Sequence, residues 1–225
     1  MSAGLSISRR RFLGRSAACA AAPYVLTSSA LGDARTPPAS ERIVMAAIGV
    51  GGQGTHNLKG FLAHDEVRMV AVCDADRSHA RAAKGLADAR YGDSACAICG
   101  DFREVLARDD VDAVSISTPD HWHTVMALEA ARRGKDIYLE KPLTLTLREG
   151  RILSDEVRRL GRVLQTGTQR RSSGVWQFMC ELAVNGYVGE IRTIRTWSSP
   201  GRAIAPQPAM PVPEGFDYDM WLGPA

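Results

Sequence analysis

A glycine-rich loop with the spacing G-x-G-x-x-G is the strongest chemical signal in the chain, and it comprises Gly49, Val50, Gly51, Gly52, Gln53 and Gly54. It follows an apolar run of strand length and precedes a helix-compatible stretch, which is the context of a dinucleotide-binding loop. In that role Gly49 permits the tight turn, Gly51 lets a pyrophosphate approach the backbone, and Gly54 lets the helix pack closely on the strand. The amides that open the helix attract phosphate oxygens. The pattern predicts a pyrophosphate site, and a purely structural glycine turn is the alternative.

Asp74 has the position that decides which dinucleotide binds. It lies 20 residues beyond Gly54, at the end of the next apolar run. A carboxylate there accepts hydrogen bonds from the adenosine ribose and repels a 2′-phosphate, which favours NAD over NADP. Arg77 follows closely, so NADP stays an alternative to NAD as the ligand. A surface aspartate without a ligand is the alternative to a cofactor role.

A third apolar run is followed by Thr118, Pro119, Asp120, His121, Trp122 and His123. Ligands of open α/β sheets bind at the carboxyl ends of the strands, so these residues are candidates for a site. Histidines two positions apart point about 200° from each other on a helix, so we predict no shared metal. We expect Asp120 to cap the helix and His121 or His123 to line the cofactor pocket. Core or capping histidines are the alternative.

The tripeptide Glu140-Lys141-Pro142 ends a further apolar run at the same predicted edge. Strand alternation sends the side chains of Glu140 and Lys141 to opposite faces. A lysine in a closed cleft can donate to a substrate hydroxyl and favour loss of its proton. Lys141 is therefore a candidate catalytic residue, and an exposed lysine at a strand end is the alternative.

Apolar runs and helix-compatible stretches alternate through the middle of the chain. The runs cover residues 43–50, 67–74, 111–118, 136–142 and 162–167, and the intervening helices include residues 77–90, 123–134 and 147–161. Strands that are apolar throughout and separated by helices predict a parallel sheet covered on both faces.

The alternation stops after Gln169. We expect a helix over 175–185, a half-exposed strand over 190–199 and a proline-rich loop over 200–215. One strand and a loop cannot close a domain. The sequence therefore predicts a dinucleotide-binding domain at 42–168 and the beginning of a second domain, incomplete in this chain, at 169–225.

The first 30 residues have the composition of an export signal. They hold four of the 28 Lys and Arg residues and no acid, so the rest of the chain carries about one net negative charge. Such a balance argues against a nucleic-acid surface, which needs clustered positive charge. Residues 8–13, SRRRFL, match the twin-arginine motif and precede an apolar run and small residues. We expect a signal at 1–30, a linker at 31–41, recognition by the Tat export machinery and a periplasmic protein; a basic arm before an ordinary helix is the alternative.

Cys96 and Cys99 have C-x-x-C spacing. One such pair is half of a zinc site, and no second half is in view. A disulfide between them is one alternative for an exported protein. Two buried thiols beside a strand are the preferred interpretation.

Five stretches of the chain together resemble the Gfo/Idh/MocA family: GVGGQG, VCDAD, TPDHWH, GKDIYLEKPLT and DYDMWLGPA. The resemblance extends from about Arg42 to Ala225. The resemblance implies an α/β fold: an N-terminal Rossmann domain with a doubly wound parallel sheet, then an α/β domain with an open, mainly antiparallel sheet. It also implies a nicotinamide cofactor, a sugar or cyclitol substrate, and a homo-oligomer when the protein is full length.

The resemblance implies a role for each matching residue. The glycine loop with Gln53 holds the pyrophosphate and Asp74 the ribose, and the nicotinamide side is flanked by Thr118, Pro119, His121 and His123. Lys141 touches both cofactor and substrate hydroxyl, Glu140 lies at the cofactor, and Pro142 is a candidate cis-proline. Gln169 faces the cofactor and Arg170 the substrate. The family's general base, a histidine with a nearby aspartate, falls beyond residue 225, so we expect this chain alone to be inactive.

Export of a dinucleotide-binding protein restricts the mechanism. A protein exported in folded form carries its cofactor along, and that cofactor must then be recycled in place. Oxidation of one sugar with reduction of a second carbonyl compound satisfies this condition. So does redox-neutral glycoside hydrolysis, as in the NAD-dependent α-N-acetylgalactosaminidases of the same family. Those enzymes typically depart from the Glu-Lys-Pro pattern, so residues 140–142 favour the oxidoreductase; a non-catalytic periplasmic sugar-binding protein is a third hypothesis.

Overall fold

The computed structural model describes residues 31–32, 37–198, 201 and 204–225. The predicted signal at 1–30 therefore lies outside the described residues. The chain divides into two compact units, 1–42 and 43–225. In the first, the described part holds a short 3-10 helix, η1 (Ala39–Glu41). The second unit contains the sheet and all of the candidate site residues.

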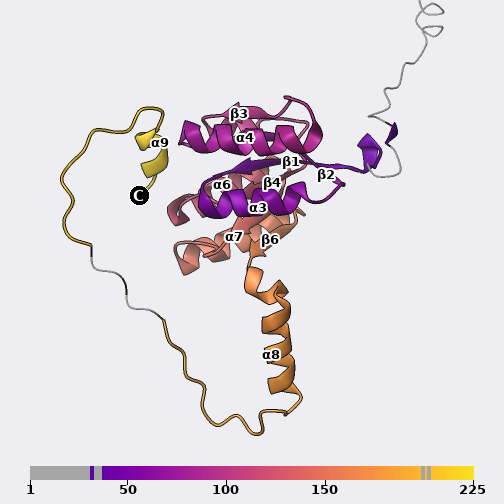
Figure 1. Cartoon of the computed structure of the whole chain (residues 1–225), viewed down its shortest axis with the longest axis vertical. Coiled ribbons are helices and arrows are strands. Elements are labelled where there is room, and N and C mark those ends of the chain that lie inside the picture. Colours follow the sequence, from indigo (N-terminus) through magenta and orange to yellow (C-terminus); the bar gives the residue numbers. More distant parts are fainter. Residues whose placement is uncertain (1–30, 33–36, 199–200, 202–203) are drawn as a thin grey trace, which may run out of the picture. The chain divides into compact units, whose positions relative to one another are not determined.

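Six parallel strands form one sheet in the order β3-β2-β1-β4-β5-β6 (Figure 1). The strands are β1 (Ile43–Ile48), β2 (Val67–Cys73), β3 (Ala97–Cys99), β4 (Ala113–Ile116), β5 (Asp136–Glu140) and β6 (Leu164–Gly167). This order is that of a Rossmann fold, in which the direction of winding reverses beside the first strand. Ile48 lies in register with Cys73 and Ile116, so the loops after β1, β2 and β4 meet at one edge.

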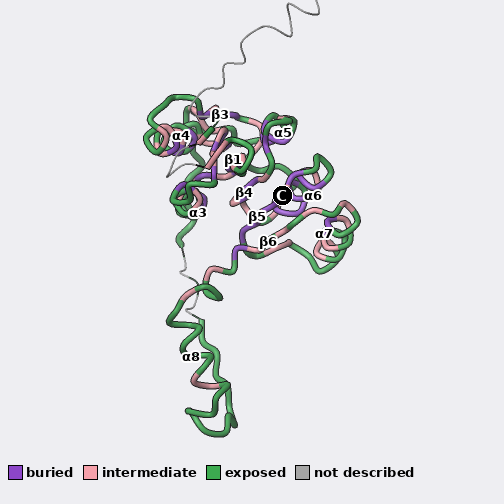
Figure 2. The backbone as a smooth tube through the Cα atoms, turned by 90° about the vertical axis from the view of Figure 1, so that its right-hand side faces the viewer, coloured by how far each residue is buried: buried purple, intermediate pink, exposed green. Residues whose placement is uncertain are grey.

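Helices cover both faces of the sheet, as Figure 2 shows. They are α3 (Gly52–Leu62), α4 (Arg77–Tyr91), α5 (Phe102–Leu106), α6 (Asp120–Arg132) and α7 (Leu147–Arg159). Met45 and Ala47 of β1 pack into a core with α3 and α4, whereas Ala46 and Ile48 pack into a second core with α5, α6 and α7. The predicted parallel sheet with two covered faces is thus confirmed, and each face contributes its own apolar core.

Two short elements were not predicted. β3 has three residues and α5 has five, so neither is long enough to show a period of its own. The fold also corrects one local prediction: α6 is capped by Pro119, without a side-chain hydrogen bond, and Asp120 is its first residue. Because the chain enters α6 through Pro119, the Asp120 carboxylate lies one position too late to cap it.

The region after β6 differs from the prediction. It contains η2 (Gln169–Ser172), α8 (Gly174–Val184) and α9 (Tyr218–Leu222). The strand expected at 190–199 is wrong for residues 190–198, which have no regular structure. A strand needs a neighbour for its backbone hydrogen bonds, and within the described part of 169–225 no second strand is present to pair with it. The second domain is expected to be incomplete in this chain, and the described residues after β6 contribute no strand to it.

In the described residues no helix combines the length and the apolar content that crossing a membrane requires.

Candidate functional site

The glycine loop turns sharply where β1 ends. Gly49 has φ +76°, and a Cβ there would lie 2.6 Å from the carbonyl oxygen of Ser117. A Cβ on Gly54 would overlap the carbonyl oxygen of Gly49. Both positions therefore require glycine, the first for its left-handed conformation and the second for close contact between helix and loop.

The first turn of α3 presents its amides beside this loop. Gly51 is the residue before the helix, and no side chain caps it. A helix start without a cap leaves N–H groups that an anion can satisfy. A Cβ on Gly52 would meet no atom within 4 Å, so the surface of the loop is open there. Gln53 is exposed and donates 3.0 Å to Asn57 Oδ1 rather than facing the sheet.

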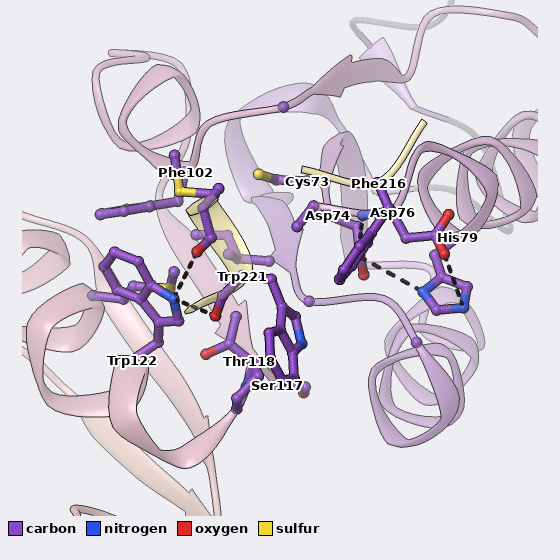
Figure 3. A pocket seen from close by; sticks show the side chains of 18 residues that line it. Cys73, Asp74, Asp76, His79, Phe102, Ser117, Thr118, Trp122, Phe216 and Trp221 are labelled. Carbon is purple, nitrogen blue, oxygen red and sulfur yellow. Dashed lines mark hydrogen bonds and ion pairs between the residues drawn. The ribbon is translucent and has the colours of Figure 1, made fainter. Parts of the chain in front are cut away.

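Asp74, directly after β2, holds the loop in place. Its Oδ2 accepts a 2.7 Å hydrogen bond from the amide of Val50, and its Oδ1 accepts one of 2.9 Å from the amide of Asp76. His79 Nδ1 lies 3.7 Å from the same carboxylate. The acidic side chain thus fixes the end of β2 to the glycine loop, and it remains at the surface of the adjoining cavity (Figure 3).

A cavity of about 200 Å³ opens at this edge of the sheet, lined by the ends of β1, β2 and β4 and by residues near α9. Gly49, Gly51, Asp74, Thr118 and Pro119 all line it, as predicted for one binding edge. The Oγ1 of Thr118 is buried and has no hydrogen-bond partner among the described residues. A buried hydroxyl is seldom left without a hydrogen-bond partner, so Thr118 is a polar residue of this edge whose hydroxyl the described residues do not satisfy.

The two histidines have different surroundings. His123 is 1% exposed, with Nδ1 2.7 Å from the oxygen of Pro142 and Nε2 2.9 Å from the oxygen of Thr118. It is a core residue that ties α6 to two loops of the binding edge. The Nε2 atom of His121 lies 3.0 Å from the backbone oxygen of Trp221. Neither ring lines the cavity, and contact with a nicotinamide remains a prediction for both.

Glu140 and Lys141 point in different directions, as strand alternation predicts. Glu140 is 4% exposed and accepts hydrogen bonds from Asn57 Nδ2, Gln169 Nε2 and the amide of Lys141. Lys141 is exposed and is joined to Pro142 by a cis peptide bond. Burial, and then the charge of Glu140, raise the pKa of Tyr138 two residues earlier. Glu140 is thus a buried carboxylate that connects β5 to α3 and η2 by hydrogen bonds, and Lys141 is exposed directly after β5.

The last two predicted site residues lie in η2. Gln169 is bound to Glu140, whereas the guanidinium of Arg170 stacks 5.1 Å from the ring centre of exposed Trp176. Neither lines the cavity. Their contacts with cofactor and substrate therefore stay predictions.

Several residues of the site were not singled out from the sequence. Asn57 is a polar residue at a buried position of α3, and helical periodicity could have marked it. Phe216, Met220 and Trp221 line the cavity from a segment far along the chain, and no local spacing signals that contact.

The cysteines near β3 and the possible metal ligands also bear on the chemistry of the site. Cys96 and Cys99 are buried free thiols next to and within β3, which confirms the preferred interpretation. Among the residues with described positions, no three His, Cys, Asp or Glu side chains come together as a metal site.

The sheet order and the glycine loop define a dinucleotide-binding Rossmann protein. The model of GFO_IDH_MocA, an oxidoreductase family with an NAD-binding Rossmann fold, matches residues 43–168. That is more than half of the chain, and the chain belongs to this family.

Relatives and solved structures extend the comparison. A glycosyl hydrolase family 109 protein of Saccharopolyspora erythraea is 41% identical over 114 residues, 49% of this chain and 25% of the relative. An alpha-N-acetylgalactosaminidase of Shewanella oneidensis is 35% identical over 115 residues, 50% of this chain and 25% of the relative. The structure of a candidate myo-inositol dehydrogenase of Sinorhizobium meliloti 1021 matches with a TM-score of 0.57 and 29% identity, covering 66% of this chain and 43% of that one. The chain thus spans a quarter of the length of these two curated relatives.

Proposed function

We propose that this chain is the cofactor-binding part of an NAD-dependent enzyme that oxidises a hydroxyl-bearing carbon of a sugar or cyclitol. The observation that carries the proposal is the glycine loop held by Asp74, beside a cavity that Asp74 and Thr118 both line. The likeness to a candidate inositol dehydrogenase supports the substrate class.

The residues at the binding edge fit a nicotinamide dinucleotide. The uncapped amides at the start of α3 hold the pyrophosphate. Asp74, which anchors Val50, would accept hydrogen bonds from the ribose hydroxyls, and Thr118 lines the same cavity. When bound, the cofactor supplies the hydride acceptor.

Lys141 is the residue that we assign to the substrate hydroxyl. Within the part of the chain that the structure describes, its amino group makes no hydrogen bond or ion pair, so it is available to a ligand. A cation beside a hydroxyl stabilises the alkoxide left when the hydroxyl proton passes to a general base, and that alkoxide becomes a carbonyl as hydride leaves the same carbon. The buried Glu140 fixes the backbone at which Lys141 starts, through the bond from the Lys141 amide. Arg170 is proposed to contact the substrate from η2.

A redox-neutral glycosidase is the second candidate, and the relatives of glycosyl hydrolase family 109 favour it. Its first step is the same oxidation. The proton beside the new carbonyl then becomes acidic, the glycosidic bond eliminates, water adds, and the hydride returns to the carbon. Both candidates need the cofactor held throughout the cycle. This requirement agrees with the proposed export by the twin-arginine route and with a periplasmic location, where no pool of NAD is available for exchange.

The test uses the full-length protein purified from the periplasm. It is first denatured to assay released NAD(H) and NADP(H); near-stoichiometric NAD supports the proposal, and a protein that is empty and binds no added NAD contradicts it. It is then incubated with sugars, cyclitols and an aryl α-N-acetylgalactosaminide. A keto product or a reduced acceptor identifies the oxidoreductase, and free sugar with unchanged NAD identifies the glycosidase. Lys141→Met should lower kcat by about 10²-fold or more, whereas the matched surface variant Lys59→Met should leave kcat and NAD affinity unchanged.

A further inference from the structure

Residues 215–223 lie against the Rossmann domain although they follow it by many residues. Phe216 forms an isolated antiparallel bridge with Asp76. The amide of Arg77 donates 3.0 Å to the oxygen of Gly215, and the amide of Asp217 donates 2.9 Å to the oxygen of Ala75. This segment is therefore paired through its backbone with the residues that directly follow Asp74.

The short helix α9 is fixed over the start of α6. The indole Nε1 of Trp122 donates 2.9 Å to the oxygen of Met220. Asp217 caps α9 by accepting from the amide of Met220. A Cβ on Gly223 would overlap the ring of Trp122, so the segment lies in direct contact with α6 at this point.

This placement brings Phe216 and Trp221 to the cavity that Asp74 and Thr118 also line (Figure 3). Phe216 and Trp221 line it with ring centroids 6.1 Å apart, and Asp74 and Thr118 line it as well. Aromatic faces near a ribose-binding carboxylate match the chemistry of adenosine, because adenine stacks on aromatic rings and its ribose hydroxyls donate to a carboxylate.

We propose that Phe216 and Trp221 form the adenine-binding wall of the dinucleotide site. The inference rests on the proposed function only in taking NAD as the ligand. It makes a segment beyond the Rossmann domain a part of the cofactor site. It also gives Trp122 and Gly223 a positioning role, because they hold α9 in place.

Calorimetry on the full-length protein, stripped of cofactor, tests the assignment with three probes. NAD and ADP-ribose carry adenosine, and nicotinamide mononucleotide does not. Trp221→Leu should weaken the binding of NAD and of ADP-ribose roughly tenfold or more, which is the range of base–aromatic stacking. It should leave the affinity for nicotinamide mononucleotide unchanged. Trp221→Phe should recover most of the affinity, because it keeps an aromatic face. Trp197→Leu is the matched control, since Trp197 is 83% exposed and does not line the cavity.

Each of the other possible results contradicts the assignment of Trp221 to the adenine site. Unchanged NAD affinity in Trp221→Leu excludes an adenine contact, while binding of NAD by the parent protein keeps the proposed function intact. Tighter NAD binding would show that Trp221 obstructs the site instead of lining it. Equal weakening of the mononucleotide would assign Trp221 to general folding, which far-UV circular dichroism would register. A parent protein that binds none of the three probes contradicts the proposed function itself.

Discussion

Asn57 donates a 2.9 Å hydrogen bond to Glu140, a carboxylate that the fold buries between α3, β5 and η2. The same amide nitrogen lies 3.1 Å from the hydroxyl oxygen of Ser117 after β4, and Gln169 adds a second bond to Glu140. The helix that opens at the glycine loop is thereby connected to β5, which ends at Glu140 directly before Lys141. A buried charge is tolerated only while its hydrogen bonds are made, so this cluster stabilises the geometry of the binding edge.

Asn57→Ala should lower the free energy of unfolding by about 1–3 kcal/mol, because it removes one donor from a buried carboxylate. Urea denaturation followed by circular dichroism measures the change. Asn185→Ala is the matched control, since Asn185 is exposed and bonds only to the oxygen of Glu181. Equal effects of the two substitutions would contradict the role given to Asn57.

Gly54→Ala should destabilise the protein by about 2 kcal/mol or more and abolish NAD binding, because its methyl group would overlap the Gly49 carbonyl. Gly52 lies two residues earlier in the same loop, and a Cβ there would meet no atom within 4 Å. Gly52→Ala should therefore change the free energy of unfolding by no more than about 0.5 kcal/mol. Thermal unfolding and calorimetric titration with NAD compare the two. A stable Gly54→Ala protein would show that the loop is looser than the structure indicates.

Asp74→Asn should lower the ratio of the NADP and NAD dissociation constants by about tenfold or more, equal to about 1.4 kcal/mol of lost discrimination. The side-chain amide keeps an oxygen for the Val50 amide, gives up the hydrogen bond from the Asp76 amide, and removes the charge that repels a 2′-phosphate. Asp112→Asn is the control, because Asp112 also accepts from a backbone amide, that of Val44, but does not line the cavity. The ratio is measured by titration with both dinucleotides, and an unaltered ratio would remove Asp74 from cofactor selection.

Cys96 should resist alkylation in the native protein. Burial raises the pKa of its thiol to about 11, so at pH 8 about one molecule in a thousand carries the reactive thiolate. Burial raises the pKa of Cys73 and of Cys99 as well. In a Cys19→Ser background, iodoacetamide at pH 8 should modify Cys180, the exposed thiol, and mass spectrometry should find the other three only after denaturation. Fast native labelling of Cys96 would contradict the buried site.

The central sheet could be predicted because its longer strands are largely apolar and alternate with helix-compatible stretches. The glycine loop and Asp74 could be predicted because their roles depend on local geometry at two strand ends. The strand interpretation failed at residues 190–198 because alternation shows only which side chains share a face, and a strand also needs a partner. His123 could not be placed because its two carbonyl partners belong to loops that spacing along the sequence does not bring together.

The contacts of α9 escaped prediction for a related reason. His121 and Trp221 are 100 positions apart, and the hydrogen bond between them exists only once the sheet has brought α6 to the binding edge. No periodicity within a window of ordinary length reports such a contact.

The pairing of residues 215–217 with residues 75–77 also concerns the order in which the molecule folds. Contacts between segments distant in the chain require a long loop to close, and they form late relative to contacts between neighbouring elements. The strands and helices of 43–168 contain their own apolar cores, so they can assemble before Phe216 reaches Asp76. We therefore expect a folding intermediate that has a complete sheet but a cavity still open on its aromatic side.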